Sequence, residues 1–122
     1  MELQVLPCDL SVCKVTDYAQ VDWSAPFTFT GYTDEEYSLV CPASAVPDNT
    51  THREDGWRGF RIVGTLDFSL VGILARIASL LAENGISIFA LSTFNTDYVL
   101  MKADAFDRAL AVLRENGYAV KG

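Results

Sequence analysis

The sequence predicts an α+β fold in which a βαββαβ unit follows a second, reduced N-terminal unit of the same kind. Residues 58–64 alternate polar and apolar side chains, as a half-buried strand does, and apolar residues at helical spacing follow. The tripeptide Glu-Asn-Gly occurs at 83–85 and again at 115–117, each time between a predicted helix and a predicted strand. Such a repeated strand–helix–strand order packs as a four-stranded antiparallel sheet with both helices on one face.

The first helix of the C-terminal half is predicted to begin at Ser69 and to continue through about Asn84. The Ser69 hydroxyl can cap the free backbone N–H groups at the helix start. Gly85 can end the helix because glycine adopts the left-handed conformation at low cost. The apolar residues at helical spacing are Leu70, Ile73, Leu74, Ile77 and Leu81.

Two strands, 86–92 and 98–102, are expected on either side of a polar turn over residues 93–97. Asp104 is then expected to cap a second helix, which ends at the second Glu-Asn-Gly. The shared apolar face of that helix consists of Phe106, Ala109, Leu110 and Leu113. A short final strand is expected at residues 118–120.

The N-terminal half is predicted to be a reduced copy of this unit. Residues 27–32 and 37–42 alternate as strands around a polar turn at 33–36. Thr33-Asp34 before Tyr37 resembles Thr96-Asp97 before Tyr98, which places a similar turn in both halves.

The remaining N-terminal segments predict the domain boundaries. Residues 3–6 and 11–15 can form one bent strand, and too few residues follow them for a full-length first helix. Residues 47–56 are polar and bounded by proline and glycine, so they are predicted to be a linker. The expected units are therefore 1–56, the reduced unit with its linker, and 57–122, the complete βαββαβ unit.

The composition excludes several classes of partner. The net charge is −7, and residues 1–58 hold ten acidic and three basic groups, whereas residues 59–122 hold six of each. Nucleic-acid binding depends on Lys and Arg that neutralise phosphates, so neither nucleic acid nor an anionic membrane is an expected partner. No apolar run reaches the roughly 20 residues that span a bilayer. Residues 1–6 have no basic segment, so no secretory signal is expected.

The residues that could carry catalysis or bind a metal are few. Cys8, Cys13 and Cys41 form no CxxC pair, and His52 is the only histidine, so no metal site is expected. We interpret the cysteines as reduced thiols of a cytosolic protein. His52 falls in the predicted linker, where a surface role is the ordinary one. Asp67, in its polar turn, is in no evident apolar pocket that would raise its pKa. We therefore expect no enzyme, no catalytic residues and no cofactor.

The turn at residues 64–72 has the properties of an anion site. The first backbone N–H groups of a helix lack intrahelical partners and, with the helix dipole, favour a carboxylate. The sequence thus predicts that N–H groups near Phe68 to Val71 bind the carboxylate of a small ligand. The plainer alternative is that Ser69 caps its own helix and Gly72 allows close packing.

The turn at residues 93–97 is its counterpart. Asp97, Asn95, Thr93 and Ser92 offer oxygen acceptors for an ammonium group, and Asp97 adds a negative charge. The alternative is ordinary turn chemistry, in which Asn and Asp bond their own backbone. Together the two turns would fit a zwitterion.

These segments resemble the ACT domain, a regulatory βαββαβ module that binds amino acids. The residues that carry the resemblance are 64–72, the helix, 85–93 and 98–101, about 60 residues in all. Residues 85–100 in particular resemble tandem-ACT proteins, which include the cytosolic arginine sensors and the regulatory regions of aspartokinases. The resemblance implies a ferredoxin-like fold with antiparallel sheets.

The resemblance also implies a function and a set of ligand contacts. In that family the ligand lies between ACT units, often across a dimer. Contacts carried over to this sequence are Asp67, Phe68, Ser69, Leu70, Val71, Ile88, Phe89 and Ala90, to which the turn adds Thr93, Asn95 and Asp97. The expectation is a cytoplasmic, homodimeric regulatory protein that binds an amino acid or similar metabolite and acts on a separate protein partner. The alternative is a structural or interaction module that keeps the fold without a ligand.

Overall fold

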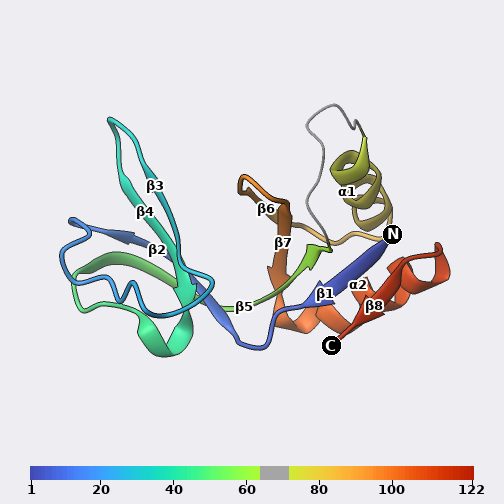
Figure 1. The fold of residues 1–122 in the computed structure, drawn as a ribbon, viewed down its shortest axis with the longest axis horizontal. Coiled ribbons are helices and arrows are strands. Elements are labelled where there is room, and N and C mark those ends of the chain that lie inside the picture. Colours follow the sequence, from blue (N-terminus) through green and yellow to red (C-terminus); the bar gives the residue numbers. More distant parts are fainter. Residues whose placement is uncertain (64–71) are drawn as a thin grey trace. The chain divides into compact units, whose positions relative to one another are not determined.

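The computed structural model describes residues 1–63 and 72–122, which form two compact units (Figure 1). The C-terminal unit consists of Met1–Pro7 together with Arg58–Gly122, and the N-terminal unit consists of Cys8–Trp57. The boundary after Trp57 lies one residue from the predicted one. Residues 1–7, however, belong to the C-terminal unit rather than to the N-terminal half in which the sequence placed them.

The C-terminal unit contains the predicted βαββαβ order and one additional strand. The order is β5 (Thr50–Ile62), α1 (Ile73–Glu83), β6 (Phe89–Ser92), β7 (Asp97–Lys102), α2 (Ala103–Glu115) and β8 (Ala119–Lys121). The extra strand, β1 (Glu2–Val5), pairs antiparallel with β5 and parallel with β8. With β7 paired to both β5 and β6, the sheet order in this unit is β8-β1-β5-β7-β6. The predicted four-stranded antiparallel sheet therefore has five strands and one parallel pair.

The core of the C-terminal unit lies between this sheet and the two helices. Alternate residues of three strands, Leu3, Phe60, Ile62, Val99 and Met101, are fully buried in one apolar cluster. Ile77 and Leu81 of α1 and Phe106 and Leu113 of α2 pack into the same cluster. Because successive strand residues point to opposite faces, both helices cover the same face of the sheet, as predicted. Arg58 lies over the Phe106 ring, 4.5 Å from its centroid.

The helix ends agree with the sequence at their C-termini and differ at their N-termini. Gly85 and Gly117 follow the two helices with φ of 71° and 92°, so the left-handed C′ glycines are confirmed. Helix α1 begins at Ile73 with Gly72 as its N-cap residue, and Ser69 lies outside the described residues. The predicted Asp104 cap is wrong. Lys102 occupies the N-cap position of α2, no side chain caps the helix, and Asp104 lies in its first turn.

The N-terminal unit is a smaller sheet with the strand order β3-β4-β2-β5. Its strands are β2 (Leu10–Val15), β3 (Phe29–Tyr32), β4 (Tyr37–Pro42) and the first part of β5, and neighbouring strands pair antiparallel. Between β2 and β3 the chain forms turns and no helix, as the short connection predicted. A single 3-10 turn, η1 (Ala43–Ala45), stands where the other unit has α2.

Two sequence-based assignments in this half are corrected. Residues 47–56 are not a linker, because Thr50 to Gly56 belong to the long strand β5, which pairs with β2. Residues 3–6 and 11–15 do not form one bent strand, because β1 and β2 pair with different parts of β5. A strand made of polar, exposed residues has the same composition as a loop, and this explains why residues 47–56 were assigned to a linker.

The core of the N-terminal unit is small and partly aromatic. Cys13, Val15, Val21, Leu39 and Cys41 are buried together, and Tyr18, Tyr37 and Val46 pack against them. Val21 and Tyr18 come from the connection between β2 and β3, so this connection covers the sheet face that a helix would otherwise cover.

The two units repeat the same hairpin with an offset of 60 residues. Phe29 pairs with Val40 and Tyr32 with Tyr37, whereas Phe89 pairs with Leu100 and Ser92 with Asp97. The burial patterns of β4 and β7 agree at five of six positions: two half-buried residues precede three buried ones, and the last residue is buried in β4 and half-buried in β7. The similarity seen in the sequence is thus at equivalent turns, but its register differs, because Tyr37 matches Asp97 instead of Tyr98 and Thr33 matches Thr93 instead of Thr96. None of the described helices is long and apolar enough to cross a membrane.

Candidate functional site

A pocket of about 380 Å³ lies within the C-terminal unit, where α1 begins and α2 ends. Three segments that are distant in sequence contribute to it. Gly72, Ile73 and Arg76 come from the start of α1, Asn116, Gly117 and Tyr118 follow α2, and Met1 precedes β1. We call this the helix-end pocket.

The start of α1 gives one side of the helix-end pocket a positive potential. Gly72 has a φ of 82°, no side chain caps the helix, and its first turn contains no acidic residue. The first helical bond runs from the Arg76 N–H to the Gly72 carbonyl oxygen at 2.9 Å, so the N–H groups before Arg76 have no intrahelical acceptor. Arg76 is exposed and forms no ion pair with any residue that the structure describes. A cation at this end of a helix adds to the dipole and favours an anion.

The residues that follow α2 line another part of the pocket. The last carbonyl groups of a helix lack intrahelical donors and carry the negative end of the dipole. Two of them accept bonds from the Asn116 and Gly117 N–H groups at 3.1 Å. The Asn116 side chain donates to the Val112 carbonyl at 2.8 Å, and the Ala119 N–H donates to the Met1 carbonyl at 3.1 Å, which fixes the segment after the helix. The pocket therefore brings the positive end of one helix dipole and the negative end of another into its lining.

A second pocket, of about 360 Å³, lies elsewhere in the same unit. It is lined by Gln4, Arg61, Ile62, Val63, Asn95, Thr96 and Tyr98. Gln4 pairs with Arg61 across β1 and β5. Their alternation with Leu3 and Ile62 places both on the sheet face that the helices leave uncovered.

The predicted ligand contacts fall in several places. Asp67, Phe68, Ser69, Leu70 and Val71 lie outside the described residues. Ile88 and Phe89 are half-buried, Ile88 against the core of the unit, and Ala90 is exposed. Of the described contacts, Asn95 lines the second pocket, and none lines the helix-end pocket.

The turn at residues 93–97 is closed by its own hydrogen bonds. The Thr93 N–H donates to the Thr96 carbonyl at 2.9 Å, and the Thr93 hydroxyl donates to the same oxygen at 3.1 Å. The Ser92 hydroxyl donates to Asp97 Oδ1 at 2.6 Å. Thr93 and Asp97 thus make the turn contacts that ordinary hairpin chemistry provides, and Asp97 retains a second carboxylate oxygen for a ligand.

The other chemically active residues lie in the N-terminal unit. Burial raises the pKa of the Cys13 thiol, and burial beside Cys13 raises the pKa of Cys41 to about 11. His52 is exposed, but it lies in strand β5 rather than in a linker, and its Nδ1 is 3.0 Å from the Thr51 hydroxyl. Within residues 1–63 and 72–122, no group of three or more His, Cys, Asp or Glu side chains could hold a metal ion.

The residues that line the helix-end pocket were hardly indicated by sequence reasoning. Arg76 was one polar residue on an amphipathic helix, and the second Glu-Asn-Gly indicated a helix end only. The one available signal for an anion site was that Arg76, near the start of α1, has no acidic residue close to it in the sequence. The pocket forms because the fold brings the start of α1 and the end of α2 close to Met1.

A ferredoxin-like βαββαβ unit with a pocket where its first helix begins defines a class of small α+β domains. The chain belongs to the ACT domain family, because the model of that family, described as "ACT domain", matches residues 52–115. The match includes β5, both helices, β6 and β7, which together form most of the C-terminal unit.

Comparison with individual proteins places the chain among regulatory relatives. It is 42% identical over 66 residues to the human cytosolic arginine sensor for mTORC1 subunit 1, and the match covers 52% of this chain and 20% of that protein. The alignment therefore spans about a fifth of the length of this relative.

Solved structures share the fold over nearly the whole chain. An Agrobacterium tumefaciens protein superposes with a TM-score of 0.85 and 27% identity, covering 98% of this chain and 90% of that one. The regulatory subunit of aspartate kinase from Thermus thermophilus gives a TM-score of 0.62 at 10% identity, covering 93% and 95%, which shows the fold alone.

Proposed function

We propose that this protein is a non-catalytic sensor that binds an amino acid or a similar small zwitterion. The observation that carries the proposal is the helix-end pocket, which is lined by the start of α1 and by the residues that follow α2. The ligand carboxylate would accept hydrogen bonds from the N–H groups at the start of α1, beside Arg76. The ligand ammonium would face the carbonyl groups at the end of α2. The contacts predicted at residues 67–71 directly precede Gly72 in the chain and belong to the same proposal.

The relatives support a regulatory role. One relative, 42% identical over 66 residues, is by name a cytosolic arginine sensor. We extend this to a cytoplasmic protein whose ligand controls a separate protein partner.

We also propose that the protein is a homodimer and that its ligand lies at an ACT–ACT interface. Within the described sheet of the C-terminal unit, β6 and β8 are the outer strands. Outer strands leave backbone groups that commonly pair with another copy of a chain. The predicted contacts Ile88, Phe89 and Ala90 lie on or beside β6, so a partner at this edge would bring them into the site.

The test is a thermal and chemical denaturation screen with the twenty amino acids. A ligand at a hundredfold excess over its Kd adds about 2.7 kcal/mol to the free energy of unfolding. Arg76→Ala is expected to weaken binding about tenfold, because it removes the cation beside the carboxylate. Arg108→Ala is the matched control, since Arg108 is an exposed arginine of α2 that does not line the pocket.

Two results would contradict the proposal. If no amino acid stabilises the protein, the chain is a structural or interaction module instead. If an amino acid binds but Arg76→Ala binds it as tightly as the native protein, the ligand lies elsewhere. Asp97→Ala then tests whether the turn at residues 93–97 holds the ammonium group.

A further inference from the structure

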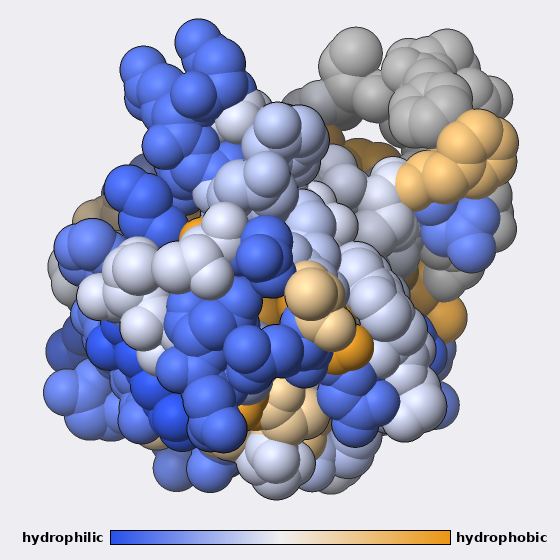
Figure 2. Space-filling view, turned by 90° about the vertical axis from the view of Figure 1, so that its left-hand side faces the viewer, coloured by the Kyte–Doolittle hydropathy of each residue, from blue (hydrophilic) through white to orange (hydrophobic). Residues whose placement is uncertain are grey.

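The net negative charge of this protein comes from the N-terminal unit. The residues of that unit include nine acidic and two basic side chains, whereas the C-terminal unit has seven of each. The whole net charge of −7 therefore belongs to Cys8–Trp57. Viewed from the side of this unit, the surface is mainly hydrophilic (Figure 2).

A continuous row of four aromatic rings lies on the N-terminal unit. Trp23 contacts Tyr18 edge to face with ring centroids 6.3 Å apart, and Tyr18 contacts Tyr37 in the same way at 5.2 Å. Tyr37 in turn stacks on Tyr32 at 4.6 Å and an interplanar angle of 24°. We call these four residues the aromatic row.

The inner rings of the aromatic row are fixed and the outer rings are exposed. Tyr18 and Tyr37 pack against the core of the unit, and the Tyr18 hydroxyl donates to the Ser38 carbonyl at 2.9 Å. Trp23 and Tyr32 are 62% and 68% exposed. Large aromatic side chains held open to water by a rigid base lose little freedom when a partner covers them.

Carboxylates surround both ends of the row. Tyr32 and Tyr37 flank the β3–β4 turn, which contains Asp34, Glu35 and Glu36, all exposed. At the other end, Asp22 directly precedes Trp23, and its Oδ1 accepts bonds from the backbone and hydroxyl of Ser24. Asp17 directly precedes Tyr18, and its Oδ1 accepts a hydrogen bond from the Ala19 N–H at 2.9 Å.

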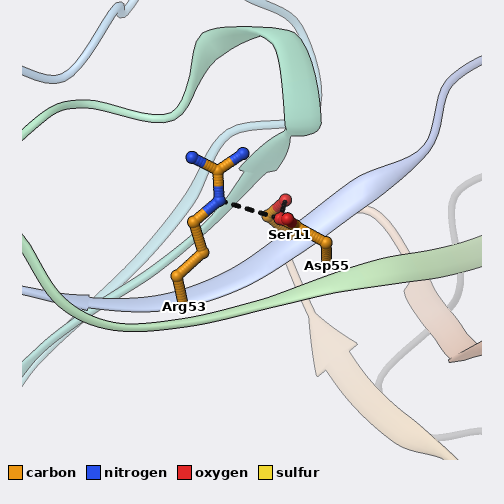
Figure 3. Close-up of polar contacts among 3 residues, drawn as sticks. All are labelled: Ser11, Arg53 and Asp55. Carbon is orange, nitrogen blue, oxygen red and sulfur yellow. Dashed lines mark hydrogen bonds and ion pairs between the residues drawn. The ribbon is translucent and has the colours of Figure 1, made fainter.

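The two basic residues of the unit do not neutralise these carboxylates. Arg53 Nε bonds to Asp55 Oδ1 at 2.9 Å, and the same oxygen accepts from the buried Ser11 hydroxyl at 2.5 Å (Figure 3). Lys14 alternates with Val15, which pairs with Tyr37, so Lys14 lies on the opposite face of the sheet.

We propose that the aromatic row is a docking surface for a basic segment of a partner protein. A Lys or Arg side chain would lie over the exposed face of Trp23 or Tyr32, where a ring attracts a cation. The carboxylates of the β3–β4 turn would pair with further basic residues of the same segment. The surface is in the N-terminal unit and needs no bound amino acid, so the proposal stands independently of the sensor function.

The test measures binding of a fluorescein-labelled decapeptide of alternating Arg and Gly by fluorescence anisotropy at low salt. The native protein is expected to bind it, with an affinity that falls as salt is added. Trp23→Leu and Tyr32→Leu each keep an apolar side chain but remove a ring, and each is expected to weaken binding about threefold to tenfold. Trp23→Phe retains a ring and is expected to bind more tightly than Trp23→Leu.

The controls separate ring contacts from general charge attraction. Phe94→Leu removes an exposed aromatic ring at the position of the C-terminal hairpin that matches Asp34, and it is expected to bind like the native protein. A triple variant, Asp34→Asn with Glu35→Gln and Glu36→Gln, is expected to lose most binding. A Glu-Gly decapeptide of the same length is not expected to bind. Circular dichroism and melting temperatures confirm that each variant is folded.

Three outcomes would overturn the proposal. One is failure of the native protein to bind the Arg-Gly peptide. Another is loss of binding in the triple variant while both leucine variants bind like the native protein, which would leave only diffuse charge attraction. The third is that Trp23→Leu dissociates an oligomer in sedimentation velocity experiments, which would assign the surface to a second copy of this chain.

Discussion

The β3–β4 and β6–β7 hairpins have the same register, 60 residues apart, but different structures cover them. The β6–β7 hairpin belongs to a sheet under two helices, whereas the β3–β4 hairpin belongs to one under a turn-rich connection and a single 3-10 turn. In the N-terminal unit, Tyr18 and Val21 supply apolar cover that α1 and α2 supply in the other. The comparison teaches that a hairpin can keep its register while its cover, charge and surface chemistry change.

The two units also differ in what they can bind. The C-terminal unit carries no net charge and has a pocket between two helix ends. The N-terminal unit has no such helix ends, because it has no α-helix, and it carries the net negative charge and the aromatic row. Our two proposals therefore place the small ligand in the C-terminal unit and the protein partner at the N-terminal unit.

Among the substitutions that test this comparison, Phe106→Ala is expected to cause the largest loss of stability. Phe106 of α2 is 1% exposed in the larger core and lies beneath Arg58. Its truncation is expected to cost about 3–5 kcal/mol of stability, measured by urea denaturation. Val46→Ala removes a half-buried side chain from the smaller core and is expected to cost about 1 kcal/mol. Equal losses would contradict the difference between the two cores.

A smaller effect is expected from glycines in the two sheets. A Cβ at Gly59 would meet Leu100 Cδ2 and lie 2.9 Å from the Val99 carbonyl oxygen, so Gly59→Ala is expected to cost about 1–3 kcal/mol. A Cβ at Gly31 has Ser38 Cβ as its nearest neighbour at 3.8 Å, and Leu91 occupies the matching position of β6. Gly31→Ala should therefore change stability by less than about 0.5 kcal/mol or raise it. If Gly31→Ala lowered stability as much as Gly59→Ala does, the N-terminal hairpin would be packed more tightly than its contacts indicate.

The smallest difference is expected at the last residue of the two turns. Thr96 is 7% exposed, and its hydroxyl donates to the Ile62 carbonyl at 2.8 Å, whereas the matching Glu36 is exposed. Thr96→Val is expected to cost about 1–2 kcal/mol, because it leaves a carbonyl group without its donor. Glu36→Ala is expected to change stability by less than about 0.5 kcal/mol. Melting curves of the two variants measure the difference, and a neutral Thr96→Val would mean that water replaces the hydroxyl.

Much of the fold could be predicted because its signals are local. The helix C-termini followed from Glu-Asn-Gly, and the hairpins followed from alternation around polar turns. The first part of β5, residues 50–56, was missed because it is mostly polar and exposed and has no apolar alternation. Only its pairing with β2 identifies it as a strand. The Asp104 cap was misplaced by two residues because Lys102 already has the extended conformation of a cap residue.

The candidate site was predicted less well than the fold. Gly72, Arg76, Asn116 and Met1, which line the helix-end pocket, were not among the predicted ligand contacts. A pocket formed by three separate segments depends on long-range packing, which periodicity does not report. The predicted contacts at 67–71 stay a prediction.

The sequence by itself determined the strand and helix order of the C-terminal unit, the absence of a full first helix in the N-terminal unit and the uneven charge. Each of these depends on nearest neighbours or on composition. Only the tertiary structure decided that β1 lies between β5 and β8, because the alternation of a four-residue strand does not specify its partner. It also decided that Trp23, Tyr18, Tyr37 and Tyr32 form one row, since ring contacts between separate segments follow from packing and not from spacing along the chain.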